Sequence, residues 1–177
     1  ESYIEVSGSF SCRDSAAYLP QELPESERTL SAYDFFCISP VFFDQSPREL
    51  GELAARLSLP ADVFYSDQLM QTFSGGERVK LQLARLLMSS PTTLLLDEPT
   101  NDLDNDSVLW LENFLLSCKL TVLFVSHDEA LLSRTATSIL LLERLRRRQV
   151  PRATLYRMGY DRFYEERGAA FEKQTRI

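Results

Sequence analysis

Residues 72–78 read Thr-Phe-Ser-Gly-Gly-Glu-Arg, and apolar residues at helical spacing follow as far as residue 87. About fourteen residues after Gly76 contain neither Gly nor Pro, so the stretch predicts a helix that begins near Ser74. The first turn of a helix has N–H groups without partners and the positive end of the helix dipole, so it can bind an anion. Gly75 and Gly76 would let the anion approach the backbone, and Ser74 could cap the helix or donate to the anion. An ordinary capped helix is the alternative interpretation.

An apolar run at residues 92–96, Thr-Thr-Leu-Leu-Leu, predicts a strand that is covered on both faces. It ends in Asp97 and Glu98, and the carboxyl ends of parallel strands line the ligand crevice of an α/β sheet. A hard oxygen ligand such as Asp97 suits magnesium bound to a nucleotide. A neighbouring carboxylate such as Glu98 can orient or deprotonate a water that attacks a phosphoryl group. Alternatively, both acids cap the helix that follows.

A second buried strand is predicted at residues 120–125, after a helix at about 107–117 that the polar cluster at 101–106 begins. This strand leads into Ser126-His127-Asp128, and His127 is the only histidine of the sequence. Its position at a strand's carboxyl end predicts the same sheet edge as the two acids. There an imidazole can donate to a terminal phosphate and hold the attacking water. A purely structural histidine is the alternative.

Two short strands are predicted at the start of the chain, at residues 3–6 and 16–19, with a turn between them. Gln21 directly follows the second strand, a position that an ordinary loop residue could also fill. From residue 22 to about 70, four prolines separate short helical segments, which indicates a small helical insert. Its helices are predicted near Thr29–Cys37 and Pro47–Leu57.

The composition is that of an ordinary globular protein, and 177 residues suit one domain or one and a half. The sequence has no apolar run of about eighteen residues and no secretory leader, so neither membrane insertion nor secretion is expected. Cys12, Cys37 and Cys118 share no metal-ligand spacing, so they are interpreted as reduced thiols of a cytoplasmic protein.

Charge is distributed unevenly along the chain. Residues 1–142 hold 9 Lys and Arg against 21 Asp and Glu, whereas residues 143–177 hold 10 against 5. The net charge is therefore −12 in the first part and +5 in the second. The basic tail is either a solvated helical face or a surface that contacts a polyanion such as RNA.

Five segments, in order along the chain, resemble the motifs of ABC-type ATPases. Residues 18–22, Tyr-Leu-Pro-Gln-Glu, are similar to the Q-loop, and Ser74-Gly75-Gly76-Glu77 is similar to the signature motif. Residues 94–99 resemble the Walker B strand with its catalytic glutamate, residues 101–104 the D-loop, and residues 126–128 the switch histidine segment. The Q-loop and Walker B sequences together look most like the ABC-F class, which are soluble tandem ATPases that act on the ribosome. Asp102 stands where many members of that class have His.

The resemblance implies an α/β fold, in the form of an incomplete ABC ATPase domain. Its parts would be a partial, mostly parallel sheet with helices, an inserted α-helical signature subdomain at about residues 22–90, and a C-terminal helical tail. The partial nucleotide-binding domain would occupy residues 1–142. The last strand and the start of a basic interdomain linker would occupy residues 143–177.

The resemblance also implies ATP and Mg²⁺ as ligands, held between this domain and a second ABC domain in cis or in trans. Ser74, Gly75 and Gly76 would contact the terminal phosphate of the nucleotide that the opposite domain holds. By the same resemblance, Glu98 would polarise the attacking water and His127 would hold the terminal phosphate. Asp97 and Gln21 would bind the metal, and Asp104 would link the two sites across the interface.

The Gly-rich loop G-x-x-x-x-G-K-[ST], which holds the triphosphate in this family, is missing from these residues. None of the six glycines of the sequence is followed by Lys, and the loop is expected upstream of Glu1. We therefore expect weak nucleotide affinity and negligible ATPase activity for the 177 residues alone. Self-association through exposed sheet edges is a further expectation.

For the intact protein, the resemblance implies ATP hydrolysis and action on the ribosome, in translation or antibiotic protection. Two alternatives remain, an ATPase subunit of an ABC transporter and an inactive ABC-like interaction module. The basic tail favours a ribosome-associated protein over a transporter subunit.

Overall fold

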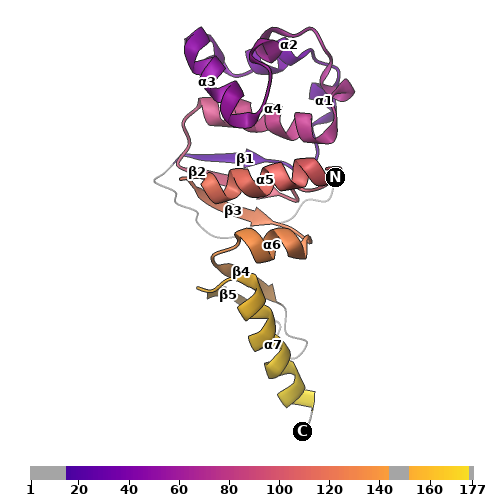
Figure 1. The fold of residues 1–177 in the computed structure, drawn as a ribbon, viewed down its shortest axis with the longest axis vertical. Helices are drawn as coiled ribbons and strands as arrows, with labels where there is room; N and C mark the ends of the chain where they lie inside the picture. Colours follow the sequence, from indigo (N-terminus) through magenta and orange to yellow (C-terminus); the bar gives the residue numbers. More distant parts are fainter. Residues whose placement is uncertain (1–14, 144–151, 176–177) are drawn as a thin grey trace. The chain divides into compact units, whose positions relative to one another are not determined.

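The computed structural model describes residues 15–143 and 152–175, with side chains described as far as Arg167. The strand predicted at residues 3–6 and Cys12 therefore lie outside the described residues. The described chain forms two compact units (Figure 1). Residues 15–99 and 119–124 make up the first, and residues 100–118 with the described residues from 125 onward make up the second.

The first unit is built on a three-stranded sheet. Its strands are β1 (Ala16–Leu19), β2 (Thr93–Asp97) and β3 (Thr121–Val125), in the order β1-β2-β3. β1 and β2 are parallel, with Leu19 opposite Leu96. The N–H of Thr121 donates to the carbonyl of Thr92 over 3.1 Å, which joins the start of β3 to the start of β2. All three strands therefore run in the same direction, and the predicted α/β fold with a parallel sheet is confirmed.

The two apolar strands are less buried than their sequences predict. Leu94 and Leu96 are fully buried on one face of β2, whereas Leu95 and Asp97 on the other face are only half-buried. In β3, the exposed fractions of Leu123 and Val125 are 50% and 58%, so the prediction of a buried strand is wrong there. An apolar run shows which side chains can be covered, but the cover depends on the layers that pack against the sheet.

The helical insert follows β1, as predicted, and contains α1 (Glu25–Arg28), α2 (Ala32–Cys37) and α3 (Pro47–Leu57). Three 3₁₀ turns connect these helices: η1 (Pro40–Asp44), η2 (Ala61–Tyr65) and η3 (Met70–Thr72). The bounds of α3 match the prediction because the sequence encodes both ends. Ser46 and Glu49 form a capping box at its start, and Ser58 ends it with a left-handed φ of 54°.

α4 (Gly75–Met88) connects the insert to the sheet, since it packs against β1 on one side and α3 on the other (Figure 1). Its buried face includes Leu81, Ala84 and Met88, as the helical spacing predicts. Arg85 fixes α4 to the insert. Its guanidinium donates to Glu27 over 2.9 Å and lies 3.8 Å from the ring centre of Phe35. The last turn of α4 is therefore held by its contacts with the insert.

The second unit contains α5 (Asn105–Ser117), α6 (Glu129–Thr135), β4 (Ile139–Glu143), β5 (Arg152–Tyr156) and α7 (Tyr160–Thr175). α6 packs against both α5 and α7, and β4 pairs with β5 as an antiparallel hairpin. β5 and α7 lie within the predicted segment 143–177, but the domain boundary between residues 142 and 143 stays a prediction. Throughout the described residues, each helix is too short or too polar to cross a bilayer.

An ion pair joins α5 to α6 and provides a test of this packing. Glu112 is 4% exposed, and both of its carboxylate oxygens accept hydrogen bonds from Arg134 Nη1, at 3.0 and 2.7 Å. Arg134→Leu should destabilise the unit by about 1–2 kcal/mol, because it leaves the buried Glu112 carboxylate without its cation. The loss is not larger because Arg134 is itself exposed, so water already screens part of its attraction to Glu112. Urea denaturation measures this loss. Arg162→Leu, which removes an exposed helical pair with Glu166, should change the midpoint little, and an equal loss in both variants would contradict the prediction.

Candidate functional site

Three predicted site residues lie at one edge of the sheet. The register between β1 and β2 places Leu19 opposite Leu96, and Gln21 and Asp97 then follow at the carboxyl ends of these neighbouring strands. Glu98 is the next residue. Gln21 is exposed, whereas the two acids are half-buried. Carboxylate and amide oxygens are thus gathered where a parallel sheet offers its ligand crevice.

The backbone at Glu98 adopts a left-handed conformation, with a φ of 43°. A residue with a Cβ is strained in this region by about 1–3 kcal/mol, and such strain often accompanies a functional position. The chain turns sharply at Glu98 as it leaves β2, which directs this side chain differently from that of Asp97. The sequence contains no glycine here that would have indicated the conformation.

Tyr18 belongs to the site, although the sequence-based prediction did not include it. Its hydroxyl donates to Asp97 Oδ2 over 3.0 Å. This hydrogen bond to a carboxylate raises the pKa of Tyr18 above its ordinary value, with burial and the negative charge of Asp97 adding to the effect. Tyr18 stands in the quoted segment 18–22, but only the strand register, which the sequence does not encode, brings it to Asp97.

Ser74 is the N-cap of α4, as the sequence predicts. Its hydroxyl accepts the N–H of Glu77 at 3.3 Å, and the Glu77 carboxylate accepts both the N–H and the hydroxyl of Ser74 at 2.8 Å. This capping box keeps the first turn of α4 rigid while Ser74 remains exposed and Gly76 is buried. The structure places Ser74, Gly75 and Gly76 on the helical insert side of the first unit, on a different element from the acids.

His127 lies in the second unit, in a turn that is stabilised by hydrogen bonds between neighbouring residues. Ser126 Oγ accepts the N–H of Asp128 at 3.1 Å, and Asp128 Oδ1 accepts the N–H groups of Ala130 and Leu131 at the start of α6. The imidazole itself is exposed. Asp104 lies in the same unit and caps α5, since its Oδ1 accepts the N–H of Ser107 at 2.9 Å. The predicted D-loop acid thus has a structural partner within its own chain.

The described residues contain no group of three or more His, Cys, Asp or Glu side chains that could hold a metal by themselves. Magnesium does not require one, since it keeps several waters and takes one or two protein oxygens together with substrate phosphates. Asp97 and Gln21 supply hard oxygen atoms at the same sheet edge. The donor set therefore fits a magnesium ion that arrives with a nucleotide.

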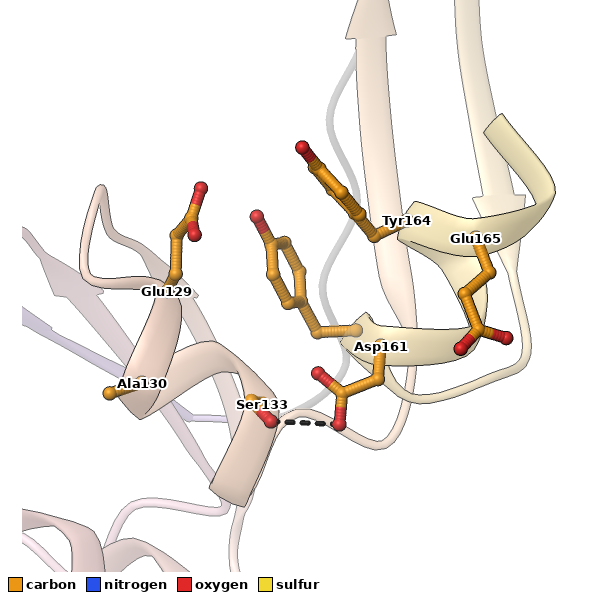
Figure 2. Close-up of a pocket in the computed structure, with 7 residues that line it drawn as sticks. Glu129, Ala130, Ser133, Asp161, Tyr164 and Glu165 are labelled. Atoms are coloured by element: carbon orange, nitrogen blue, oxygen red, sulfur yellow. Dashed lines mark hydrogen bonds between the residues drawn. The ribbon is translucent and has the colours of Figure 1, made fainter. Parts of the chain in front are cut away.

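A cavity of about 520 Å³ lies in the second unit, and none of the predicted site residues lines it (Figure 2). It lies between α6 and α7, where Ser133 donates to Asp161 over 2.8 Å. Its lining residues are Glu129, Ala130, Ser133, Tyr160, Asp161, Tyr164 and Glu165. Carboxylates stand on both walls, Glu129 on α6 and Asp161 and Glu165 on α7, and would repel a phosphate, so the cavity does not suit a nucleotide.

Comparisons with known proteins place this arrangement in a family. Residues 6–101 match the family described as ABC transporter. ATP-binding cassette sub-family F member 3 of Rattus norvegicus is 40% identical over 117 residues, which cover 66% of this chain and 16% of that protein. Elongation factor 3 of Phytophthora infestans (strain T30-4) is 32% identical over 154 residues, which cover 86% of this chain and 14% of that protein.

A solved structure has a similar fold. The complex of archaeal ribosomal stalk protein aP1 and archaeal ribosome recycling factor aABCE1 matches with a TM-score of 0.63 and 23% identity, over 90% of this chain and 31% of that chain. The chain spans about one sixth of the length of the curated relatives it matches. The matched segment contains the Q-loop, signature and Walker B residues quoted above. The chain therefore belongs to the ABC transporter family and is similar to the ATPase domains of its F-type members.

Proposed function

We propose that this chain is the signature-bearing part of an ABC-F-type ATPase domain, and that the intact protein hydrolyses ATP and acts on the ribosome. The observation that carries the proposal is the carboxyl edge of the sheet, where Gln21, Asp97 and Glu98 stand together. The left-handed backbone of Glu98 is compatible with this role but does not carry it, since Ser58, Ser90 and Asp102 also have a positive φ.

Each residue would have a separate task. Asp97 and Gln21 would hold a magnesium ion, which when bound would neutralise phosphate charge. Glu98 would orient and deprotonate the attacking water, since a carboxylate within hydrogen-bond reach of that water is what this step requires. His127, as a hydrogen-bond donor, would contact the terminal phosphate.

The start of α4 would act on the nucleotide of a second ABC domain. The capping box already uses the Ser74 hydroxyl within the chain, so the amides of Gly75 and Gly76 are the donors we expect to face the phosphate. The Glu77 carboxylate lies at the same helix start and would repel an anion. The proposal therefore requires this carboxylate to form an ion pair or to rotate away when the phosphate binds. Asp104 would link the two domains from the start of α5.

Action in translation is supported by the sequence relatives. One is named as an ABC sub-family F member and another as an elongation factor. The basic segment at residues 143–177, with 10 Lys and Arg against 5 Asp and Glu, suits contact with ribosomal RNA. Antibiotic protection is one form that this action could take.

Ribosome sedimentation with the full-length protein tests the proposal. Glu98→Gln should cosediment with ribosomes in the presence of ATP and not with ADP, because an unhydrolysed nucleotide keeps the two ABC domains closed. Wild-type protein should cosediment more weakly with ATP, since hydrolysis reopens the domains. If the variant stays in the supernatant with both nucleotides, action on the ribosome is contradicted. Cosedimentation with membranes instead would favour the ATPase subunit of a transporter.

A further inference from the structure

Tyr18 and Asp97 lie on the same face of the sheet, one step apart along the strand direction. Tyr18 is opposite Leu95 in the parallel register, and Asp97 follows Leu95 by two residues, so both side chains point to one side. This is the half-buried face, since Ala17 and Leu19 of β1 point to the buried side. A tyrosine is long enough to reach such a diagonal neighbour.

The hydrogen bond between them has a defined direction. The Tyr18 hydroxyl donates to Asp97 Oδ2 over 3.0 Å, and donation to an ionised carboxylate is stronger than donation to a neutral acceptor. One oxygen of Asp97 is thereby engaged by the neighbouring strand. This hydrogen bond restricts the rotation of the carboxylate. A metal or its waters would then contact the other oxygen, Oδ1.

Tyr18 is also connected to Gln21 through the backbone. Leu19 ends β1 and Pro20 follows it, and the proline ring fixes φ at about −65°, which limits how the chain can leave the strand. The strand that supplies the phenol for Asp97 therefore also supplies the amide of Gln21. A shift of β1 relative to β2 would disturb both oxygen donors together.

We propose that Tyr18 is a positioning residue, which orients Asp97 for the metal and couples its position to that of Gln21. This inference rests on the proposed function, because it takes Asp97 to be a metal ligand. Tyr18 does not touch the metal in this proposal and acts only through Asp97. Its exposed fraction of 53% leaves space above the phenol for an incoming ion and its waters.

Binding of Mn²⁺ to the full-length protein in the presence of a non-hydrolysable ATP analogue, followed by the electron paramagnetic resonance of the bound ion, tests the proposal. Tyr18→Phe should weaken Mn²⁺ binding by about three- to tenfold, the range expected for one charge-assisted hydrogen bond that is partly exposed to water. In an Asp97→Asn background, Tyr18→Phe should have no further effect, because the residue acts only through the carboxylate. Tyr164→Phe, which removes a hydroxyl from another exposed tyrosine, is the matched control and should bind like wild type.

The outcomes separate this inference from the proposed function. If Asp97→Asn weakens Mn²⁺ binding and Tyr18→Phe does not, Tyr18 has no positioning role, while the metal role of Asp97 stands. If wild type and Asp97→Asn bind Mn²⁺ equally in the presence of the nucleotide analogue, Asp97 is not the metal ligand and both proposals fail. Equal additional losses from Tyr18→Phe in both backgrounds would indicate a general structural effect and would overturn the positioning role.

Discussion

Glu98→Gln is expected to lower the rate of ATP hydrolysis by the full-length protein by about 10²–10⁴-fold, the contribution typical of a general base. The substitution keeps the size of the side chain and removes only its ability to take a proton. Nucleotide binding should persist, because Asp97, Gln21 and the start of α4 are unchanged. Steady-state phosphate release measures the first effect, and binding of a fluorescent ATP analogue measures the second.

The control for this prediction is Glu52→Gln, which makes the same chemical change on the exposed face of α3. Glu52 forms an exposed ion pair with Arg48 one helical turn away, so its loss should leave hydrolysis at the wild-type rate. A fall in hydrolysis in both variants would indicate a general effect on stability. Hydrolysis by Glu98→Gln within about threefold of wild type would rule Glu98 out as the general base.

Because the backbone of Glu98 is left-handed, two substitutions at this position can separate the effect of the carboxylate on hydrolysis from the effect of backbone strain. Replacing Glu98 by Gly would relieve strain and also remove the carboxylate, whereas Gln removes the charge and keeps the strain. Both variants should be inactive if the carboxylate acts as the base, and the Gly variant should be the more stable of the two. Activity in the Gly variant would show that hydrolysis does not need the Glu98 carboxylate.

The sequence predicts the local features of the site well. Ser74 and Glu77 are three residues apart, so the capping box that starts α4 can be read directly from the chain, and the structure contains it. The acids after β2 and the helix α3 are similarly encoded by neighbouring residues. These features depend on interactions within a few positions, which is the range in which sequence patterns are informative.

Contacts between distant residues could not be predicted. Tyr18 and Asp97 are 79 positions apart, and Glu112 and Arg134 are 22 positions apart. Each pair meets because two elements pack in one register or at one crossing, which no periodicity in the sequence specifies. The half-exposed faces of β2 and β3 were missed for the same reason. Asp104 belongs to the polar cluster that the sequence predicts as the start of a helix, and the structure confirms its capping role, whereas the interface role implied by the motif resemblance stays a prediction.

The second large effect is expected at the centre of the helical insert, where Phe36→Ala should reduce the free energy of unfolding by about 3–5 kcal/mol. Phe36 is fully buried, and its ring centre lies 4.9 Å from that of Phe64 and 5.4 Å from that of Phe35. Truncation removes apolar surface and leaves a cavity that the rigid neighbours cannot close. The loss is comparable with the whole stability of a marginal domain, about 5–15 kcal/mol.

Phe43→Ala is the matched control, because it deletes the same side chain from the same insert. Phe43 is 66% exposed, so its removal should change the stability by only about 0.5 kcal/mol. Urea denaturation followed by circular dichroism compares the two variants. Equal losses would show that the rings contribute through general apolar content, and the buried cluster would then not be the core of the insert.

The loss at Phe36 should also reach α4, because Arg85 stacks on Phe35 and pairs with Glu27. Hydrogen exchange can follow this, since regions of a protein open locally with separate free energies. In Phe36→Ala, the amides of α2 and α4 should lose protection, whereas those of α5 and α6 in the second unit should keep theirs. Uniform loss of protection in both units would mean that the chain unfolds as one cooperative body, and α4 would then not depend on the insert in particular.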